Sequence, residues 1–364
     1  MKIQELIDLG RKHAFSAIAE KIYLTTGLDF TRPIAFYGLV NERCNFKCQS
    51  CSSWRLEHYA EEMSIAEWQA ALLSIKDFVG NFSISFSGGE PLLKPGMIDL
   101  LSWCGHNDIR AGITTNGSAL TRANAEKIVA AHPFNVNLSL DAPNAELHDR
   151  LRGFAGSYQK VTDGIGYLLE ERKRQNGSFP IVIKPTVNVK NFRLIPELVE
   201  WAAAFGDLCV SPQPMGGWTQ EATDLLWIKG QEIDELEVVI EKLVQMRREG
   251  APILAPEANL RRMADHFRGK KAPRSAMPCL VGLRNFNIRT NGDVGVCYDG
   301  FPSIGNLRTQ SAREIWHSKK ARQVRKATVA CEKLCLTTCQ SQKSLRNKVE
   351  MALLLLKRSR SVKS

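Results

Sequence analysis

The 364-residue sequence lacks the features of a membrane or secreted protein. No run of roughly 18 apolar residues occurs, which excludes a transmembrane helix. The first 30 residues lack an uninterrupted apolar core, because Glu5, Asp8 and Glu20 interrupt it, so we predict no secretory signal. Internal repeats are absent, and 44% apolar with 24% charged residues is ordinary globular usage. The length favours about two domains, or one large domain with an extension.

The regular cysteine spacing of a secreted disulfide scaffold is also missing. Such scaffolds are short and evenly cross-linked. Here three of the ten cysteines lie within eight residues, five lie in the last quarter, and Cys104 and Cys209 stand alone. Clustered cysteines in a cytosolic protein more often bind metal or carry out redox chemistry. We therefore expect a cytoplasmic protein with cysteine-based metal sites.

Strand and helix signals alternate between residues 34 and 215. Apolar runs typical of buried strands occur at 34–40, 82–86, 109–114, 134–140, 181–189 and 208–211. Helical segments lie between them, at 98–103, 121–131, 157–175 and 194–205. This alternation predicts an α/β fold, a partial (β/α)6 barrel similar to a TIM barrel, with its helices outside the parallel sheet. Ligands on such folds bind at the carboxyl ends of the strands.

The pattern changes after residue 215. Apolar residues at helical spacing between Ile233 and Met246 indicate a long amphipathic helix. Residues 251–340 are rich in Pro, Gly and basic residues, and the Asn291-Gly292 turn favours a hairpin that pairs 286–288 with 294–296. We therefore expect four parts: a helical segment at 1–32, an α/β core at 33–225, a linker helix with a small cysteine-rich α+β extension at 226–340, and a basic amphipathic tail at 341–364.

Three cysteines, Cys44, Cys48 and Cys51, directly follow the first predicted strand. Three thiolates can hold one iron–sulfur cube, and since a cube has four irons, one iron then stays open. An open coordination position distinguishes a catalytic metal site from a structural one. The alternatives are cysteines that pack on one helix face, which the polar flanking residues disfavour, and a structural zinc site.

The Cys-x3-Cys-x2-Cys spacing after the first strand resembles the signature of radical S-adenosylmethionine (SAM) enzymes. Residues 87–91, Ser-Gly-Gly-Glu-Pro, end the second strand and are similar to the Gly-Gly-Glu-Pro motif of that family. Gly88 and Gly89 would let the backbone approach a ligand closely. Glu90 would accept a hydrogen bond from a cationic amine.

The resemblance continues at the later strand ends and covers roughly residues 34–215. It implies that Asn116 contacts SAM, that Ser139 and Asp141 lie near the ribose, and that Arg152 binds the carboxylate, since an arginine fork suits a carboxylate. The family often has an aromatic residue before the third cysteine, where this chain has Ser50. The contacts to adenine therefore stay open, with Trp54 as one candidate.

A second cysteine set comprises Cys279, Cys297, Cys331, Cys335 and Cys339. It resembles the auxiliary-cluster extension of radical SAM enzymes, in its long (SPASM) or short (twitch) form. The Cys-x2-Cys-x5-Cys-x3-Cys run with which the long form holds two clusters is absent. The resemblance therefore implies one auxiliary 4Fe-4S cluster, held by the first three cysteines and by either of the last two. A zinc knuckle is the alternative.

The resemblance implies a reaction in which the cofactors carry the difficult chemistry. A donor such as flavodoxin or ferredoxin would reduce the SAM-binding 4Fe-4S cluster, and SAM would be cleaved to a 5′-deoxyadenosyl radical that abstracts hydrogen from a C–H bond. No His/Asp/Ser constellation stands out, and we expect most of the seven histidines to lie on the surface or in loops. Cys209, on the sixth predicted strand, is either a small buried residue or a thiol that returns a hydrogen atom.

The net charge of +11 is concentrated in residues 341–364, which hold seven basic residues and one acidic residue. This tail would lie on an anionic membrane or dock on the enzyme body. No array of aromatic and basic residues suggests nucleic-acid binding. We expect a peptide or natural-product intermediate as substrate, with a carbohydrate or membrane lipid as alternatives. The alternative that is not an enzyme is a zinc-stabilised RNA-binding protein.

Overall fold

The structure is a computed structural model that describes residues 3–56, 61–217, 219–271, 278–298 and 300–336, with side chains from residue 10 onward. One large sheet organises the molecule, in the order β11-β10-β9-β1-β2-β3-β4-β5-β7. Its strands are β1 (Ala35–Leu39), β2 (Ser83–Ser87), β3 (Arg110–Thr115), β4 (Val136–Leu138), β5 (Ile181–Ile183), β7 (Leu208–Val210), β9 (Asn285–Ile288), β10 (Asp293–Gly295) and β11 (Gly305–Asn306). Every neighbouring pair from β9 to β7 is parallel.

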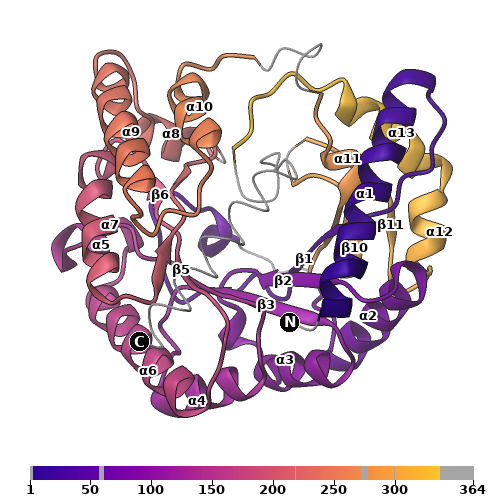
Figure 1. Cartoon of the computed structure of the whole chain (residues 1–364), viewed down its shortest axis with the longest axis horizontal. Coiled ribbons are helices and arrows are strands. Elements are labelled where there is room, and N and C mark those ends of the chain that lie inside the picture. The colour runs from indigo at the N-terminus through magenta and orange to yellow at the C-terminus, as the bar shows by residue number, and fades with distance from the viewer. Residues whose placement is uncertain (1–2, 57–60, 218, 272–277, 299, 337–364) are drawn as a thin grey trace.

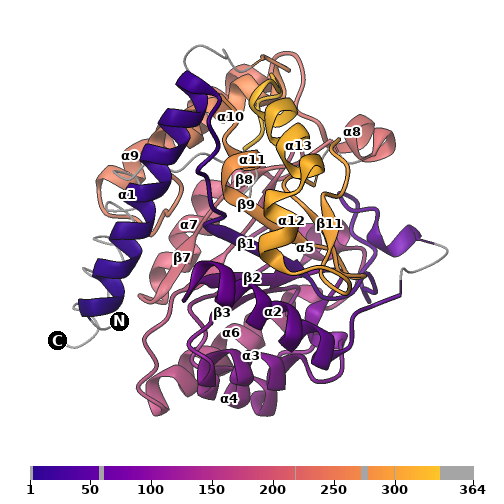
Figure 2. The same ribbon diagram turned by 90° about the vertical axis from the view of Figure 1, so that its right-hand side faces the viewer.

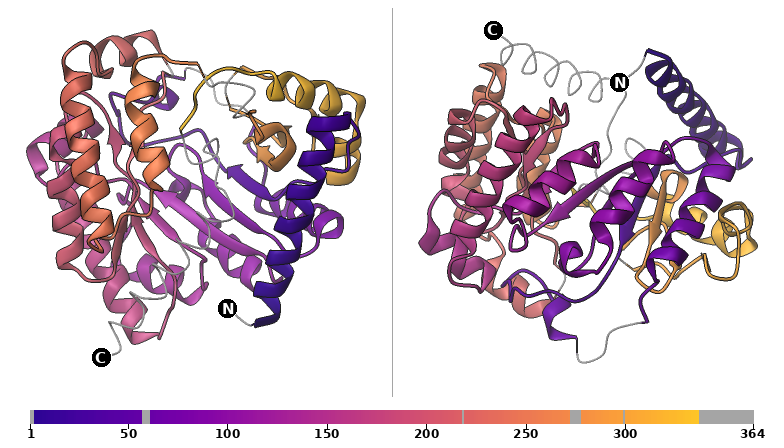
Figure 3. Two further views of the ribbon diagram at one scale, coloured as in Figure 1. Left: turned by 45° about the horizontal axis from the view of Figure 1, so that its top comes forward. Right: turned by 90° about the horizontal axis from the view of Figure 1, so that it is seen from below.

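Helices surround the outer face of this curved sheet (Figure 1). They are α1 (Ile3–Thr26), α2 (Ile65–Val79), α3 (Met97–His106), α4 (Arg122–Ala130), α5 (Ala145–Arg152), α6 (Ser157–Arg174), α7 (Ile195–Ala204), α8 (Gln220–Leu226), α9 (Glu232–Arg248), α10 (Glu257–Phe267), α11 (Val281–Arg284), α12 (Ala312–His317) and α13 (Lys319–Val329). Among the described strands the two edges, β11 and β7, do not pair with each other, so the barrel is open. Figure 3 shows α9 and α10 on the side away from α12 and α13. The predicted partial α/β barrel is confirmed.

The predicted strands are present, with one correction. A single strand over 181–189 was wrong, because the segment divides into β5 and β6 (Thr186–Val187). Pro185 separates the two pieces, and proline has no N–H to continue a ladder. β6 instead pairs with β8 (Gln213–Pro214) in a second, two-stranded sheet.

The C-terminal extension continues the sheet of the core. β9 pairs in parallel with β1, with Phe36 opposite Phe286. The predicted hairpin is confirmed, since β9 and β10 are antiparallel and Gly292 takes a φ of 88° in the turn. The following helices α12 and α13 lie beside α1 and α2 (Figure 2), where Arg325 of α13 pairs with Asp29. The predicted tail 341–364 and Cys339 lie outside the described residues.

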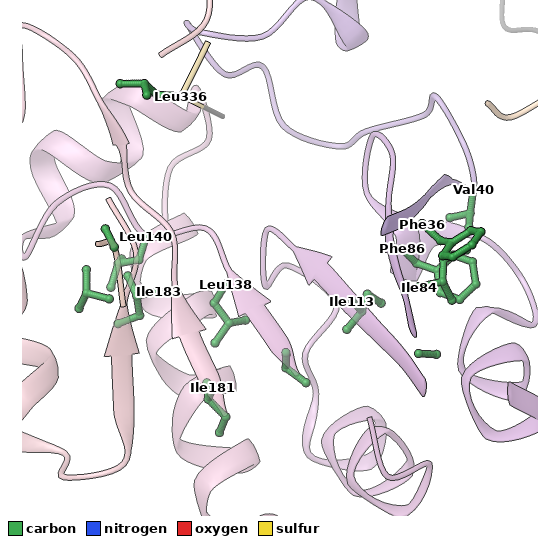
Figure 4. Close-up of a cluster of buried hydrophobic side chains, with 14 of the residues drawn as sticks. Phe36, Val40, Ile84, Phe86, Ile113, Leu138, Leu140, Ile181, Ile183 and Leu336 are labelled. Carbon is green, nitrogen blue, oxygen red and sulfur yellow. The ribbon is translucent and has the colours of Figure 1, made fainter. Parts of the chain in front are cut away.

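Alternating residues give the sheet two different faces. Phe36, Ile84, Ile113, Leu138 and Ile183 point toward the helices and form the apolar core (Figure 4). The residues between them point to the concave side, and many of these are polar, such as Ser85, Thr114 and Asn137 on β2, β3 and β4. The loops that leave the carboxyl ends of the strands therefore surround a partly polar interior. None of the described helices is long and apolar enough to cross a bilayer.

Candidate active site

The loop that follows β1 carries the first three cysteines and is tied to two neighbouring elements. The amide Nδ2 of Asn41 donates to the carbonyl of Glu90 at 2.8 Å. On the other side, the backbone N–H of Gln49 donates to the carbonyl of Leu151 at 2.9 Å, at the end of α5. Phe46 is buried and stacks on Phe154 with ring centres 4.7 Å apart. The loop is thus held by contacts that do not involve the cysteine sulfurs.

Gly88 and Gly89 make the end of β2 fit against this loop. A Cβ on Gly88 would lie 2.4 Å from the carbonyl oxygen of Asn41, and one on Gly89 would lie 2.1 Å from that of Arg43. Gly88 also has a φ of 153°. Two backbone hydrogen bonds join the same segments. The N–H of Gly89 donates to the carbonyl of Asn41 at 3.0 Å, and the N–H of Glu90 donates to the carbonyl of Arg43 at 2.8 Å. These two glycines therefore allow the end of β2 to lie directly against the cysteine loop.

Glu90 is fully buried and joins the ends of β2 and β3. Its carboxylate accepts from the Thr115 hydroxyl at 2.7 Å, the Asn116 N–H at 2.7 Å and the Leu92 N–H at 3.0 Å. Burial raises the pKa of Glu90, and these three donors oppose the shift. A carboxylate has about four acceptor positions, so one remains for a further donor such as an amine.

Asn116 lies between β3 and the cysteine loop. Its Nδ2 atom is 3.7 Å from Sγ of Cys44 and 3.1 Å from Oδ1 of Asn45. Its Oδ1 atom accepts from the N–H of Ser118 at 2.8 Å, which fixes the amide orientation. Asn116 therefore presents an N–H to a cysteine sulfur, as an outer partner of a metal ligand does.

Arg152 is buried between Asp141 and Cys48. Its Nε atom is 2.8 Å from Oδ2 of Asp141, and its NH1 group points to Sγ of Cys48 at 3.9 Å. The other carboxylate oxygen of Asp141 accepts from the N–H of Thr186 at 2.8 Å. The structure thus brings the predicted ribose and carboxylate residues together, with the guanidinium engaged by protein groups. A contact of Arg152 with the carboxylate of SAM stays a prediction.

The thiols of the loop differ in exposure. Cys48 is buried, Cys44 is half-buried and Cys51 is exposed. Burial raises the pKa of Cys48 to about 11, an effect that Arg152 opposes, and burial also raises the pKa of Cys44. Iron ligands must be thiolates, so binding of a cluster would release protons here.

These residues fit an iron–sulfur cube. One loop supplies soft thiolates, which are suitable ligands for iron. N–H groups of Asn116 and Arg152 are directed at two of these sulfurs. Within the described part of the chain, no three His, Cys, Asp or Glu side chains converge on a point suited to a single metal ion. A cube binds each thiolate through a separate iron, so it does not require such convergence.

The other predicted residues of this edge have weaker contacts. The backbone N–H of Ser139 donates to the carbonyl of Thr115 at 3.0 Å, which places it at the same strand edge. Trp54 donates from Nε1 to the carbonyl of Cys48 at 3.1 Å and lies beside the loop. Cys209 is buried on β7, in register with Val182, and alternates with Leu208 of the apolar core. Its side chain therefore belongs to the concave face.

Sequence reasoning missed the importance of His148. We expected most histidines on the surface, but His148 is fully buried on α5, and burial lowers its pKa to about 4. Its Nδ1 atom accepts from the N–H of Asp141 at 3.1 Å. Because His148 and Arg152 are four residues apart on one helix, they share a face. That spacing was the signal that could have revealed it.

The second cysteine set gathers beside α11 and α13. The pKa of Cys279 is raised to about 11, chiefly by burial and in smaller part by the neighbouring charges of Cys331 and Cys297. Gly282 of α11 packs tightly on α13, where a Cβ would lie 1.9 Å from the hydroxyl of Thr328. Cys335 is half-buried. Cys279, Cys297 and Cys331 come from three separate segments of the extension, and their role as ligands of one auxiliary cluster stays a prediction.

Comparison with known proteins identifies both cysteine regions. Residues 39–199 match the family described as the radical SAM superfamily, and residues 279–340 match SPASM, an iron–sulfur cluster-binding domain. An AdoMet-dependent heme synthase of Methanosarcina barkeri is 26% identical over 298 residues, or 76% of this chain and 79% of that protein. A PqqA peptide cyclase of Rhodopseudomonas palustris is 26% identical over 302 residues, or 80% and 75% of the two chains.

A heme synthase of Nitratidesulfovibrio vulgaris is 32% identical over 130 residues, but this match covers only 35% of each chain. Among solved structures, SuiB of Streptococcus suis bound to S-adenosylmethionine aligns with a TM-score of 0.64 at 16% identity, over 83% of this chain and 69% of that chain. Native anSMEcpe with bound AdoMet aligns with a TM-score of 0.63 at 15% identity, over 90% and 97%. These likenesses show the fold. The two family matches establish that the chain is a radical SAM superfamily enzyme with a C-terminal SPASM-type iron–sulfur extension.

Proposed function

We propose that the enzyme binds a 4Fe-4S cluster through Cys44, Cys48 and Cys51, with SAM beside it, and abstracts hydrogen from a C–H bond of its substrate. When bound, these cofactors supply the one-electron chemistry that converts SAM into a hydrogen-abstracting radical. The observation that carries the proposal is the set of N–H groups, from Asn116 and Arg152, aimed at Cys44 and Cys48.

The chain's own residues hold and orient these groups. Glu90 keeps one acceptor position for the amine of SAM, while Gly88 and Gly89 seat the cysteine loop on β2. Asn116 and Arg152 orient two cysteine sulfurs, and Asp141 holds the guanidinium of Arg152. We assign the ribose to the neighbourhood of Ser139. No proton transfer by a histidine is required.

A peptide is the substrate class that we favour. A PqqA peptide cyclase is among the relatives, and one related structure is that of SuiB bound to the precursor peptide SuiA. A heme synthase is also among the relatives, so a macrocyclic intermediate is an alternative, as are the carbohydrate and lipid substrates considered above.

For the extension we propose one auxiliary cluster, held by Cys279, Cys297, Cys331 and either Cys335 or Cys339. With four protein ligands, no iron would be open to substrate, so this cluster would move electrons. A flavodoxin or ferredoxin would supply the reducing electron. Cys209, on the concave face, is a candidate for returning hydrogen to a substrate radical.

Anaerobic purification and metal analysis test the cluster assignment. We expect brown protein with about eight irons per chain, four for each cube. Cys48→Ala should abolish the formation of 5′-deoxyadenosine from SAM and dithionite. Cys104→Ala is the matched control, because Cys104 is a buried cysteine in the apolar core on α3. Colourless protein with stoichiometric zinc, or full cleavage by Cys48→Ala, would contradict the proposal.

A further inference from the structure

A buried amide on β9 has no hydrogen-bond partner among the residues that the structure describes. Asn287 exposes only 1% of its surface, and neither Oδ1 nor Nδ2 of its side chain has a hydrogen-bond partner. An amide buried without partners loses its hydration with no compensating bond, and this destabilises the folded state. Such groups are rare in native proteins and require an explanation.

The side chain of Asn287 belongs to the concave face of the sheet. Its neighbours Phe286 and Ile288 are part of the apolar core on the other face, where the Phe286 ring lies 5.9 Å from that of Phe36 and 6.3 Å from that of Trp316. Since side chains alternate along a strand, Asn287 points the opposite way, into the interior that the strands surround.

The residues in register with Asn287 on the neighbouring strands are also small or polar. Asn287 is opposite Tyr37, which is opposite Ser85, which in turn is opposite Gly112. At Gly112 the missing side chain leaves room for Asn135, because a Cβ there would lie 2.0 Å from Oδ1 of Asn135. That oxygen is also buried without a partner.

Another amide on the concave face shows that the protein can satisfy such groups internally. Nδ2 of Asn137 donates to the hydroxyl of Thr114 at 3.0 Å, and its Oδ1 accepts from Nδ2 of Asn135 at 3.4 Å. The described residues give Asn287 no hydrogen-bond partner, although it is buried to a similar degree. A partner from outside the described residues, such as a bound ligand, would complete these hydrogen bonds.

We infer that Asn287 binds a primary carboxamide of the substrate, or the N–H and C=O of one residue in an extended peptide, with Oδ1 accepting from the N–H and Nδ2 donating to the C=O. An amide side chain offers one acceptor and two donors side by side. A primary carboxamide, or the N–H and C=O of one extended residue, matches this pair in two parallel bonds. The N–H and C=O of a single trans peptide group point in opposite directions and do not. The inference rests on the proposed function, since it names the substrate class for the same interior. It also gives β9, a strand of the C-terminal extension, a direct role in substrate binding.

A stability measurement tests whether the amide is unpartnered in the free protein. Asn287→Leu replaces it by an apolar group of similar size, so the thermal midpoint should rise by about 2–4 °C. Asn285→Leu is the matched control. Asn285 lies on the same strand and face and is 3% exposed, but it has partners within the protein, so its replacement should lower the midpoint. A lower midpoint for Asn287→Leu would overturn the inference.

A binding measurement tests the ligand class. In protein labelled with 15N-asparagine, the Asn287 side-chain signal, assigned by its loss in Asn287→Leu, should shift saturably on titration with N-acetylglycinamide. Glucose should leave it unchanged. A shift with glucose alone, or with neither compound, would overturn the inference. Neither measurement depends on SAM cleavage, so their outcome is separate from that of the proposed function.

Discussion

Asn116 places its amide nitrogen 3.7 Å from the sulfur of Cys44, although 72 residues separate the two in the sequence. This contact joins the end of β3 to the cysteine loop after β1. An N–H directed at a ligand sulfur stabilises the thiolate and affects the reduction potential of a cluster. The relationship leads to a prediction about cluster binding.

Asn116→Ala should lower cluster affinity or SAM cleavage by roughly 10–100-fold, which is the usual effect of losing an outer partner of a metal ligand. Iron content after gel filtration and the rate of 5′-deoxyadenosine formation measure the two quantities. Asn124→Ala is a control for loss of a half-buried asparagine on α4 whose amide bonds to the Ala119 carbonyl and does not reach the cysteines. Equal iron content and rate in Asn116→Ala and the wild type would contradict the prediction.

Arg152→Met should destabilise the protein by about 3–5 kcal/mol, because it leaves the buried carboxylate of Asp141 without its cation. Urea unfolding of the metal-free protein measures this loss. The double variant Asp141→Asn with Arg152→Met removes both charges and keeps the acceptor for Thr186, so it should recover much of the stability. A double variant less stable than Arg152→Met alone would show that the ion pair is not the cause.

Gly89→Ala should destabilise the protein by about 1–3 kcal/mol and reduce iron loading, because its Cβ would collide with the carbonyl of Arg43. Chemical unfolding and iron analysis measure both effects. Gly166→Ala is the matched control: Gly166 lies within α6 and a Cβ there meets nothing within 4 Å. That variant should gain about 0.5–1 kcal/mol from helix propensity. A neutral Gly89→Ala would mean that the loop can shift without loss.

His148 should make stability depend on pH below neutrality. Burial lowers its pKa from 6.5 to about 4, so the folded state binds fewer protons than the unfolded state within this range. His148 therefore makes its full contribution to the free energy of unfolding above about pH 6.5. As pH falls toward 4 this contribution is lost, and the total loss is about 3 kcal/mol. His148→Asn keeps an acceptor for the N–H of Asp141 and should flatten the unfolding free energy between pH 6.5 and 4. A variant profile parallel to that of the wild type would contradict this.

The amino-acid sequence by itself determined the elements and the cofactor class. Apolar periodicity acts over a few residues, so it located the strands of the core and six of the thirteen described α-helices. It missed the break between β5 and β6, which falls at Pro185. The spacing of Cys44, Cys48 and Cys51 depends only on a single loop, which is why the radical SAM resemblance was visible before the fold was known.

Only the tertiary structure decided which groups meet across the strands. It paired β9 with β1 across some 250 residues of sequence, engaged Arg152 with Asp141, and left Asn287 without a hydrogen-bond partner among the described residues. Hydrogen bonds need partners within about 3 Å and aligned, and no local pattern states which distant residues the folded chain brings to that distance. The sequence therefore shows which type of site this is, and the packing of the folded chain decides which residues meet in it.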